Sequence, residues 1–308
     1  MSNYNFKYLI DRINEAEFTK YPFRHLFIKD FFNKSHFDEI KSSFEIKSSV
    51  ALDDKELINS IIAQGYEVIE FPGCVSDTDK YINWHQNLSE GEHHSACEGF
   101  GMVLRLKTPS SSIINEVYKF FGSEIFNSSI AQKLEIDFNK CSIDFGIQKY
   151  LDGYEISPHA DIKQKAATYM ININPIKNSE YENYHTHYLK FRKKYKYVQE
   201  YWRDNTDIDR AWVPWHWAKT IKTQKENNSL VLFSPHYCSL HAVKANYDHL
   251  NKQRTQIYGN LWYKNSSKNH TPQWEDLDFG SNFFQENIKY LKLHQKLKLK
   301  LKSIIDKL

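Results

Sequence analysis

The spacing of apolar residues predicts a mixed, largely helical first part of the chain. Apolar residues in 6–13 and again in 37–44 recur at helical intervals. Between them, YPFRHLFIKDFF is typical of a strand that enters a turn, and GFGMVLRLKT (99–108) of another strand. SSSIINEVYKFFGSEIF begins with serines suited to an N-cap and predicts a further helix. We therefore expect residues 1–130 to form a helical and mixed support region.

From about residue 133 the pattern changes to short runs of β-branched and aromatic residues. KLEIDFNKCSIDFGIQKYLDG, KAATYMININP, NNSLVLFSP and RTQIYGNLWYK are such runs, and polar turns separate them. Strands without long intervening amphipathic helices favour a sandwich or jelly roll over a parallel α/β sheet. We predict a mainly β (α+β) fold with flanking helices, in which residues 133–265 form a jelly-roll core.

Two segments lie outside this pattern. Residues 176–222, rich in Tyr, Trp and charge, are too long for a simple strand connection, and we interpret them as an insertion near the mouth of the barrel. Its tryptophans would wall a substrate pocket or pack against the barrel: Trp202, Trp212, Trp215 and Trp217.

Residues 280–308 carry a helical apolar stripe and predict a C-terminal amphipathic helix that covers the core or forms a homodimer seam. The length of 308 residues is enough for one large domain, and we expect a single domain, 1–308.

Composition and charge narrow the class of protein. The hydrophobic fraction of 41% and charged fraction of 26% are typical of a soluble globular chain, and a net charge of +3 is too small to imply a nucleic-acid partner. The four cysteines are scattered without a C-x-x-C pair, which argues against a disulfide framework and fits a reducing compartment. The sequence shows neither a signal-peptide pattern nor an apolar run of about 18 residues. We expect a cytoplasmic protein without a membrane span.

The sharpest chemical feature is ISPHADI, in which His159 and Asp161 flank one residue. On an extended chain these two side chains share one face, so an imidazole and a carboxylate can bind one ion. H-x-D alone is a weak signal in a chain with 14 histidines. A later strand leads to His241 in SLHAVKA, and Arg254 heads the next strand. Two histidines and a carboxylate on one side of a metal are the arrangement of non-haem Fe(II) oxygenases.

The order of these features resembles the Fe(II)/2-oxoglutarate-dependent oxygenases of the prolyl-4-hydroxylase type, which have a double-stranded β-helix core. Besides H-x-D, the resemblance rests on F-x-x-x-x-x-S-x-H-x-V (Phe233 to Val243) and R-x-x-x-x-G-x-x-x-Y (Arg254 to Tyr263). It covers about residues 135–265. It implies Fe(II) as the metal and 2-oxoglutarate and O2 as co-substrates.

By this resemblance the iron ligands are His159, Asp161 and His241. The resemblance also implies a set of co-substrate contacts, in which Arg254 pairs with the distal carboxylate and three further residues lie nearby: Gln256, Tyr150 and Tyr169. A guanidinium suits the first task because its planar fork binds a carboxylate through two bonds. Related enzymes often have a hydroxyl residue in place of Gln256, and core packing is an equal alternative for both tyrosines.

The implied reaction is hydroxylation of an unactivated C–H bond, with release of succinate and CO2. Related halogenases replace the ligand carboxylate by a small residue, so Asp161 favours hydroxylation, desaturation or cyclisation instead. We expect a small-molecule substrate, such as an amino acid, a sugar or a natural product. Two alternatives stay open: a cupin-like metalloenzyme that does not use 2-oxoglutarate, and a non-catalytic binding protein on the same scaffold.

Several other side chains compete for these roles. His236 is the rival of His241 for the distal ligand position, although SLHAV fits the family pattern better. The pairs His185/His187 and His93/His94 are further candidates for a metal site, with solvated or pocket histidines as the favoured alternative. Two basic residues on a strand before the core would bind an anionic substrate or face solvent: Arg105 and Lys107.

Overall fold

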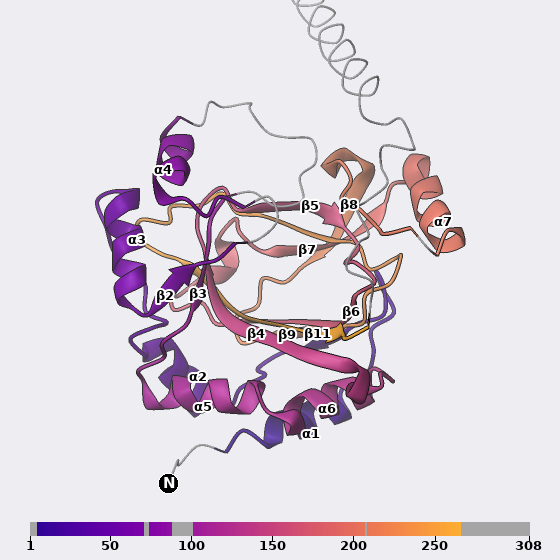
Figure 1. The fold of residues 1–308 in the computed structure, drawn as a ribbon, viewed down its shortest axis with the longest axis horizontal. Helices are drawn as coiled ribbons and strands as arrows, with labels where there is room; N and C mark the ends of the chain where they lie inside the picture. Colours follow the sequence, from indigo (N-terminus) through magenta and orange to yellow (C-terminus); the bar gives the residue numbers. More distant parts are fainter. Residues whose placement is uncertain (1–4, 71–73, 88–100, 207, 266–308) are drawn as a thin grey trace, which may run out of the picture.

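Two antiparallel sheets face each other in the computed structural model, which describes residues 5–70, 74–87, 101–206 and 208–265 (Figure 1). The larger sheet has seven strands, in the order β1 (Leu26–Ile28), β9 (Leu230–Phe233), β6 (Lys165–Asn172), β11 (Arg254–Tyr263), β4 (Cys141–Tyr150), β3 (Val103–Leu106) and β2 (Tyr66–Val68). The smaller sheet has four, in the order β5 (Glu155–His159), β10 (His241–Lys244), β7 (Thr186–Phe191) and β8 (Ala218–Thr223). The α+β class with a strand-rich core is confirmed.

Seven α-helices surround the sheets in the described part of the chain: α1 (Tyr8–Glu15), α2 (Lys34–Ser42), α3 (Asp54–Ala63), α4 (Thr78–Gln86), α5 (Ser112–Phe121), α6 (Glu124–Lys133) and α7 (Lys196–Asp204). Four of them, α1, α2, α5 and α6, cover the outer face of the larger sheet (Figure 1). The described residues also form short 3-10 helices: η1 (Phe138–Lys140), η2 (Ser179–Tyr181), η3 (Lys193–Tyr195) and η4 (Trp215–Trp217).

Strand alternation gives the larger sheet two chemically different faces. On β11, Ile257 and Leu261 are fully buried in the apolar core beneath α5 and α6. The intervening even-numbered residues point toward the smaller sheet, and they are polar or amphipathic: Arg254, Gln256, Tyr258, Asn260 and Trp262. Since successive side chains of a strand point to opposite faces, the helices stabilise one side of the sheet and leave the other available for chemistry.

The predicted insertion at 176–222 is wrong in part. It contains β7 and nearly all of β8, which pair with each other and complete the smaller sheet. THYLKF and AKTIKT contain charged residues and lack a continuous apolar face, so their strand character was hidden in a polar segment. The true excursion is shorter, at 192–217, and contains η3, α7 and η4.

Other expectations from the first part of the chain agree with the structure. The run YPFRHLFIKDFF contains β1, which pairs with β9 at the edge of the larger sheet. The serine-rich run precedes α5, whose N-cap is Ser111, but the hydroxyl of Ser111 bonds the Glu45 carboxylate rather than the helix. The predicted C-terminal helix at 280–308 lies outside the described residues.

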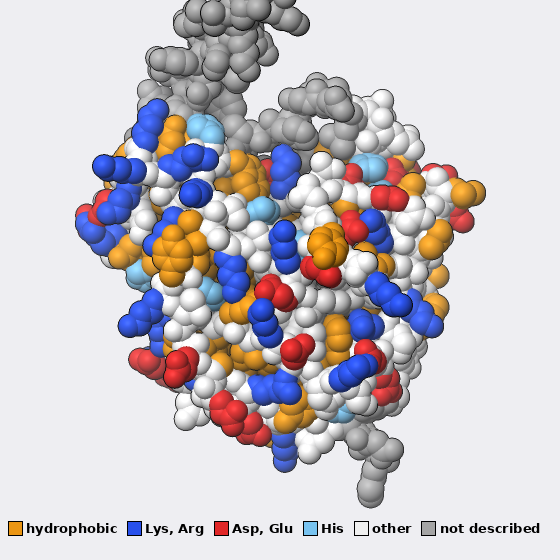
Figure 2. Space-filling view, turned by 180° about the vertical axis from the view of Figure 1, so that it is seen from behind, with side chains coloured by type: hydrophobic (Ala, Val, Ile, Leu, Met, Phe, Trp, Pro, Cys, Tyr) orange, Lys and Arg blue, Asp and Glu red, His pale blue; other side chains and the backbone are white. Residues whose placement is uncertain are grey.

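Charged side chains of both signs lie on the surface of the described residues (Figure 2). On the face seen in Figure 2, basic and acidic side chains are interspersed over most of the area. Among the described residues, the search for a helix both long and apolar enough to cross a membrane finds none.

Candidate metal centre and its cavity

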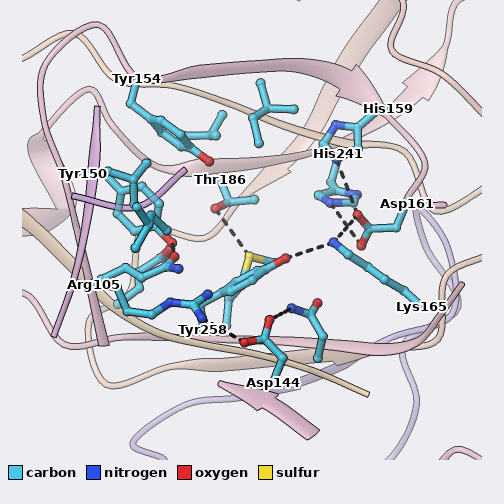
Figure 3. Close-up of a pocket in the computed structure, with 18 of the residues that line it drawn as sticks. Arg105, Asp144, Tyr150, Tyr154, His159, Asp161, Lys165, Thr186, His241 and Tyr258 are labelled. Atoms are coloured by element: carbon cyan, nitrogen blue, oxygen red, sulfur yellow. Dashed lines mark hydrogen bonds and ion pairs between the residues drawn. The ribbon is translucent and has the colours of Figure 1, made fainter. Parts of the chain in front are cut away.

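Three side chains converge where the ends of two strands of the smaller sheet meet. His159 and His241 are directly paired across β5 and β10, with ring centroids 4.3 Å apart. Asp161 follows β5 and places one carboxylate oxygen 3.7 Å from Nε2 of His159 and the other 3.8 Å from Nε2 of His241 (Figure 3). All three ligand atoms lie within 4.8 Å of one another. The structure thus brings together the residues that the sequence singled out.

In each imidazole, the hydrogen bond at Nδ1 determines which of the two ring nitrogens can bind a metal. Nδ1 of His159 lies 2.8 Å from the backbone carbonyl of Ser157, and Nδ1 of His241 lies 2.9 Å from that of Ser239. A carbonyl only accepts, so each Nδ1 carries the proton and each Nε2 directs its lone pair toward Asp161. Burial, together with the neighbouring His159, lowers the pKa of His241 to about 4 and favours the neutral ligand form.

Asp161 is held ionised by its surroundings. Burial alone would raise its pKa, but the neighbouring Lys165 ammonium holds the pKa well below its usual range. Lys165 donates to one carboxylate oxygen at 2.8 Å and the hydroxyl of Thr168 donates to the other at 2.8 Å. Lys165 also donates to the hydroxyl of Tyr258 at 3.0 Å. The donor set of two neutral imidazoles and one carboxylate fits a divalent transition metal such as Fe(II).

A cavity of about 710 Å³ extends from this cluster between the two sheets. Arg254 lines it and is only 2% exposed. Its Nη2 donates to Thr186 and Gln256, both at 3.0 Å, whereas Nη1 is buried without a hydrogen-bond partner. Among the described residues, no carboxylate forms an ion pair with it. A buried, uncompensated guanidinium is costly, so the site fits an anionic ligand such as a carboxylate.

Two further predicted contacts lie in the same cavity. The ring of Tyr150 lies 4.5 Å below the Arg254 guanidinium. The side-chain amide of Gln256 is already engaged on both sides, since its oxygen accepts from Arg254 and its nitrogen donates to Asn172 at 2.7 Å. Gln256 therefore orients the guanidinium, and the predicted direct bond to the co-substrate would have to replace one of these contacts.

The prediction for Tyr169 is wrong. Tyr169 is fully buried on the helix-facing side of β6, where its ring packs against Phe121 and Phe126 at centroid distances of 6.1 and 5.7 Å. It lies over its cross-strand partner Gly259. Its strand neighbours Thr168 and Met170 take the opposite side. A one-residue difference in strand position therefore moves the phenol to the helix side, away from the cavity.

The rival histidines are all placed elsewhere. His236 lies in the turn before β10, with Nδ1 3.1 Å from the sulfur of Cys238, and it does not line the cavity. His185 bonds the carbonyl of Ser179, and His187 pairs with the hydroxyl of Thr220. His93 and His94 fall outside the described residues.

The aromatic and basic candidates divide into two groups. Trp212 lines the cavity, whereas Trp202 and Trp217 are buried in a separate apolar cluster of the excursion and the indole of Trp215 donates to Glu155. Arg105 and Lys107 line the cavity, and Arg105 forms a 2.8 Å ion pair with Asp144.

Sequence reasoning missed four residues that line the cavity, Lys165, Arg210, Tyr258 and Asn260, and also Thr168, which contacts Asp161. Two of these had a usable signal, since Tyr258 and Asn260 share the even-numbered face of β11 with Arg254. The hydroxyl of Thr168 connects Asp161 to the side chain of Asn260, at 2.8 and 3.2 Å. That link depends on the pairing of β6 with β11, which no local pattern reveals.

A second cluster of similar composition lies at the other end of the molecule. Asp54, His85 and His249 are also close enough to share an ion. However, the backbone N–H of Asp152 donates to Nδ1 of His249 at 3.1 Å, so Nε2 carries the proton and donates to Asp54 at 2.8 Å. Both ring nitrogens of His85 face carboxylates, Asp54 at 2.9 Å and Asp152 at 3.0 Å. The protons required by these contacts occupy the metal-binding positions, so this cluster is a hydrogen-bonded ion-pair network.

Comparison with known proteins returns matches among solved structures. No family model matches the chain, and neither does any curated protein. A prolyl-4-hydroxylase of Pseudomonas putida is similar over 84% of this chain and 100% of its own, with 8% identity and a TM-score of 0.42. A prolyl hydroxylase from Trichoplax adhaerens, solved with a peptide of hypoxia inducible factor, is similar over 84% and 89%, with 13% identity and a TM-score of 0.43.

A third similar structure is the epimerase SnoN in complex with Fe3+, alpha ketoglutarate and nogalamycin RO. It matches 83% of this chain and 83% of its own, with 9% identity and a TM-score of 0.38. Since every TM-score is below 0.5, the assignment of the cavity rests on its own side chains.

Proposed function

We propose that this protein is an Fe(II)- and 2-oxoglutarate-dependent oxygenase with a double-stranded β-helix core, which hydroxylates a small molecule. One observation carries the proposal: a single cavity contains both a His–Asp–His cluster with correctly oriented imidazoles and a buried guanidinium without an anionic partner. The first fits a divalent metal, and the second fits the distal carboxylate of 2-oxoglutarate.

The side chains would divide the work as follows. His159, Asp161 and His241 would hold the iron on one side, and Thr168 and Lys165 fix the carboxylate of Asp161 for that task. Bound iron and 2-oxoglutarate would supply the oxidising chemistry, in which O2 is consumed and succinate and CO2 are released.

The remaining groups would orient the co-substrate and keep water away from it. Arg254 would bind the distal carboxylate, held in place by Thr186 and Gln256 and covered by the Tyr150 ring. Because Asp161 supplies a carboxylate ligand, hydroxylation is favoured over halogenation. The buried Nη1 of Arg254, which has no partner in the protein, supports an anionic co-substrate over a cupin-like enzyme or a binding protein that has no anionic ligand.

The proposal is tested by metal binding and by turnover. Purified protein supplied with Fe(II), 2-oxoglutarate and O2 should form succinate, and Asp161→Ala and His241→Ala should abolish both this activity and Co(II) binding. His236→Ala is the matched control, because its side chain lies only five positions from His241 and outside the cavity. The assignment is wrong if His236→Ala loses Co(II) binding and His241→Ala keeps it. Absence of both 2-oxoglutarate binding and succinate formation in the wild type would refute the function.

The cellular setting belongs to the same proposal. We infer a cytoplasmic enzyme acting on a small molecule, in line with the scattered cysteines and the modest net charge. A homodimer through residues 280–308 and the single-domain organisation stay predictions.

A further inference from the structure

Two guanidinium groups without a carboxylate partner line the cavity, and the co-substrate accounts for one of them. Arg254 is the buried one described above. The other is Arg210, which donates from Nε and Nη2 to the backbone carbonyl of Asp161 at 3.2 and 2.9 Å. A carbonyl neutralises no charge, and in the described part of the chain no carboxylate lies within ion-pair distance of Arg210, although Asp161 and its buried neighbour Asp209 attract it from farther away. The cavity therefore contains a second cationic position next to the metal ligands.

The other basic groups of the cavity do not provide such a position. Lys165 is paired with Asp161, and Arg105 is paired with Asp144 at 2.8 Å. Lys107 is exposed. Arg210 is half-buried, so solvent screens its charge less than that of an exposed side chain.

The excursion at 192–217 positions Arg210 next to the His–Asp–His cluster. On its return the chain runs along the end of β5, where the N–H of Val213 donates to the carbonyl of Pro158 at 2.7 Å. Arg210, three residues before Val213 in the sequence, donates to the carbonyl of Asp161. Trp212, which lies between Arg210 and Val213 in the sequence, lines the cavity. Arg210 and Trp212, two positions apart in the sequence, therefore line the same cavity as the His–Asp–His cluster.

The geometry of the guanidinium selects the kind of anion. With Nε and one N–H of Nη2 used on the carbonyl, the outer edge formed by Nη1 and Nη2 still offers two parallel N–H groups. Such an edge matches the two oxygens of a carboxylate, and the indole offers apolar area beside it. A phosphate site would require several such donors, whereas the other described basic residues of the lining are paired, exposed or assigned to the co-substrate.

We propose that Arg210 binds the carboxylate of the substrate, with Trp212 packed against its apolar part, and that the substrate is a small organic acid or amino acid. This inference rests on the proposed function, because it names the substrate class of the same site. Arg210 is thereby a specificity-determining residue, and Arg254 serves the co-substrate.

The test uses matched acid and amide probes. The full chain, loaded with Co(II) and saturated with 2-oxoglutarate, is titrated with three pairs: acetate and acetamide, benzoate and benzamide, and L-phenylalanine and L-phenylalaninamide. At least one acid should bind about tenfold more tightly than its amide, the difference expected for one charge-assisted hydrogen bond. Arg210→Gln should remove this preference, and Arg210→Lys should keep part of it. Arg203→Gln is the control, since Arg203 lies on α7 of the same excursion and pairs with Glu200 and Asp204.

Co(II) and 2-oxoglutarate affinities of the same proteins separate the outcomes. If the wild type binds both but prefers none of the acids, or if Arg210→Gln keeps the preference, this inference is overturned and the proposed function stands. If Arg210→Gln loses Co(II) binding together with the preference, the residue is structural and the inference is also overturned. Failure of the wild type to bind Co(II) and 2-oxoglutarate would overturn the proposed function itself.

Discussion

Replacing Arg254 by Met should remove 2-oxoglutarate binding and leave the metal cluster intact. The guanidinium is 2% exposed, and its Nη1 has no partner within the protein. An incoming carboxylate would therefore gain charge-assisted hydrogen bonds that cost the protein no existing contact. Methionine fills similar space without a donor or a charge, so the carboxylate would enter a dry site without compensation.

The magnitude follows from the number of bonds lost. Two charge-assisted hydrogen bonds at about 1.5 kcal/mol each make about 3 kcal/mol, or about a 150-fold higher Kd. At a 2-oxoglutarate concentration 100 times the wild-type Kd, the ligand should stabilise the wild type by about 2.7 kcal/mol but the variant by about 0.3 kcal/mol. At about 2 °C per kcal/mol for a chain of this size, the thermal shift should fall from about 5 °C to below about 1 °C.

The assay is thermal unfolding of the Mn(II)-loaded protein with and without 2-oxoglutarate. Arg105→Met is the matched control, because this guanidinium lines the same cavity but is already paired with Asp144. Arg254→Lys should give an intermediate shift, since an ammonium keeps the charge but not the planar fork. A full shift in Arg254→Met, or an equal loss in Arg105→Met, would refute the assigned role.

Three further substitutions probe the surroundings of the site. Gly259→Ala should destabilise the fold by about 1–3 kcal/mol in urea unfolding, because a Cβ there would meet the Tyr169 ring, while 2-oxoglutarate affinity should stay unchanged. Thr168→Val should weaken Co(II) binding about 10- to 100-fold, measured by absorbance, because Asp161 loses a buried hydrogen bond; unchanged affinity would contradict this. Burial opposes charge on His85, but the two aspartates that flank it raise its pKa above the model-peptide value of 6.5. Its stabilisation is therefore full below pH 6.5 and lost as pH rises through the raised pKa, so the stability difference between wild type and His85→Gln should shrink from pH 5.5 to 8.5.

The His159–Asp161–His241 cluster could be predicted because part of its geometry is encoded locally. The two residues of H-x-D share one face of extended chain, and His241 meets them because the pairing of β5 with β10 places it opposite His159. The choice of His241 over His236 rested on the family pattern, and the structure places only His241 in the cavity. Arg254 was predictable for a related reason, since it begins the strand that follows the distal histidine.

Features that depend on the pairing of distant strands could not be predicted. Tyr169 was assigned to the cavity because it lies on a flanking strand, but its face is set by the register of β6 against β11, in which it pairs with Gly259. Lys165 contacts Asp161 only because the chain turns between β5 and β6. The strands β7 and β8 were hidden because charge is tolerated on edge and solvent-facing positions of a small sheet.

The immediate backbone surroundings of each imidazole decide which histidines can form a metal centre. His159 and His241 each follow a serine by two positions, and each directs Nδ1 to that serine's carbonyl. His25 makes the same contact with the carbonyl of Phe23, but its Nε2 is buried without a partner and no carboxylate of the described residues faces it. His249 has carboxylate neighbours, but a backbone N–H occupies its Nδ1 and forces the proton onto Nε2. An imidazole presents a lone pair to an ion only when a carbonyl lies behind the ring and a carboxylate lies in front of it. This condition selects the His159–Asp161–His241 cluster over the second cluster of nearly the same composition.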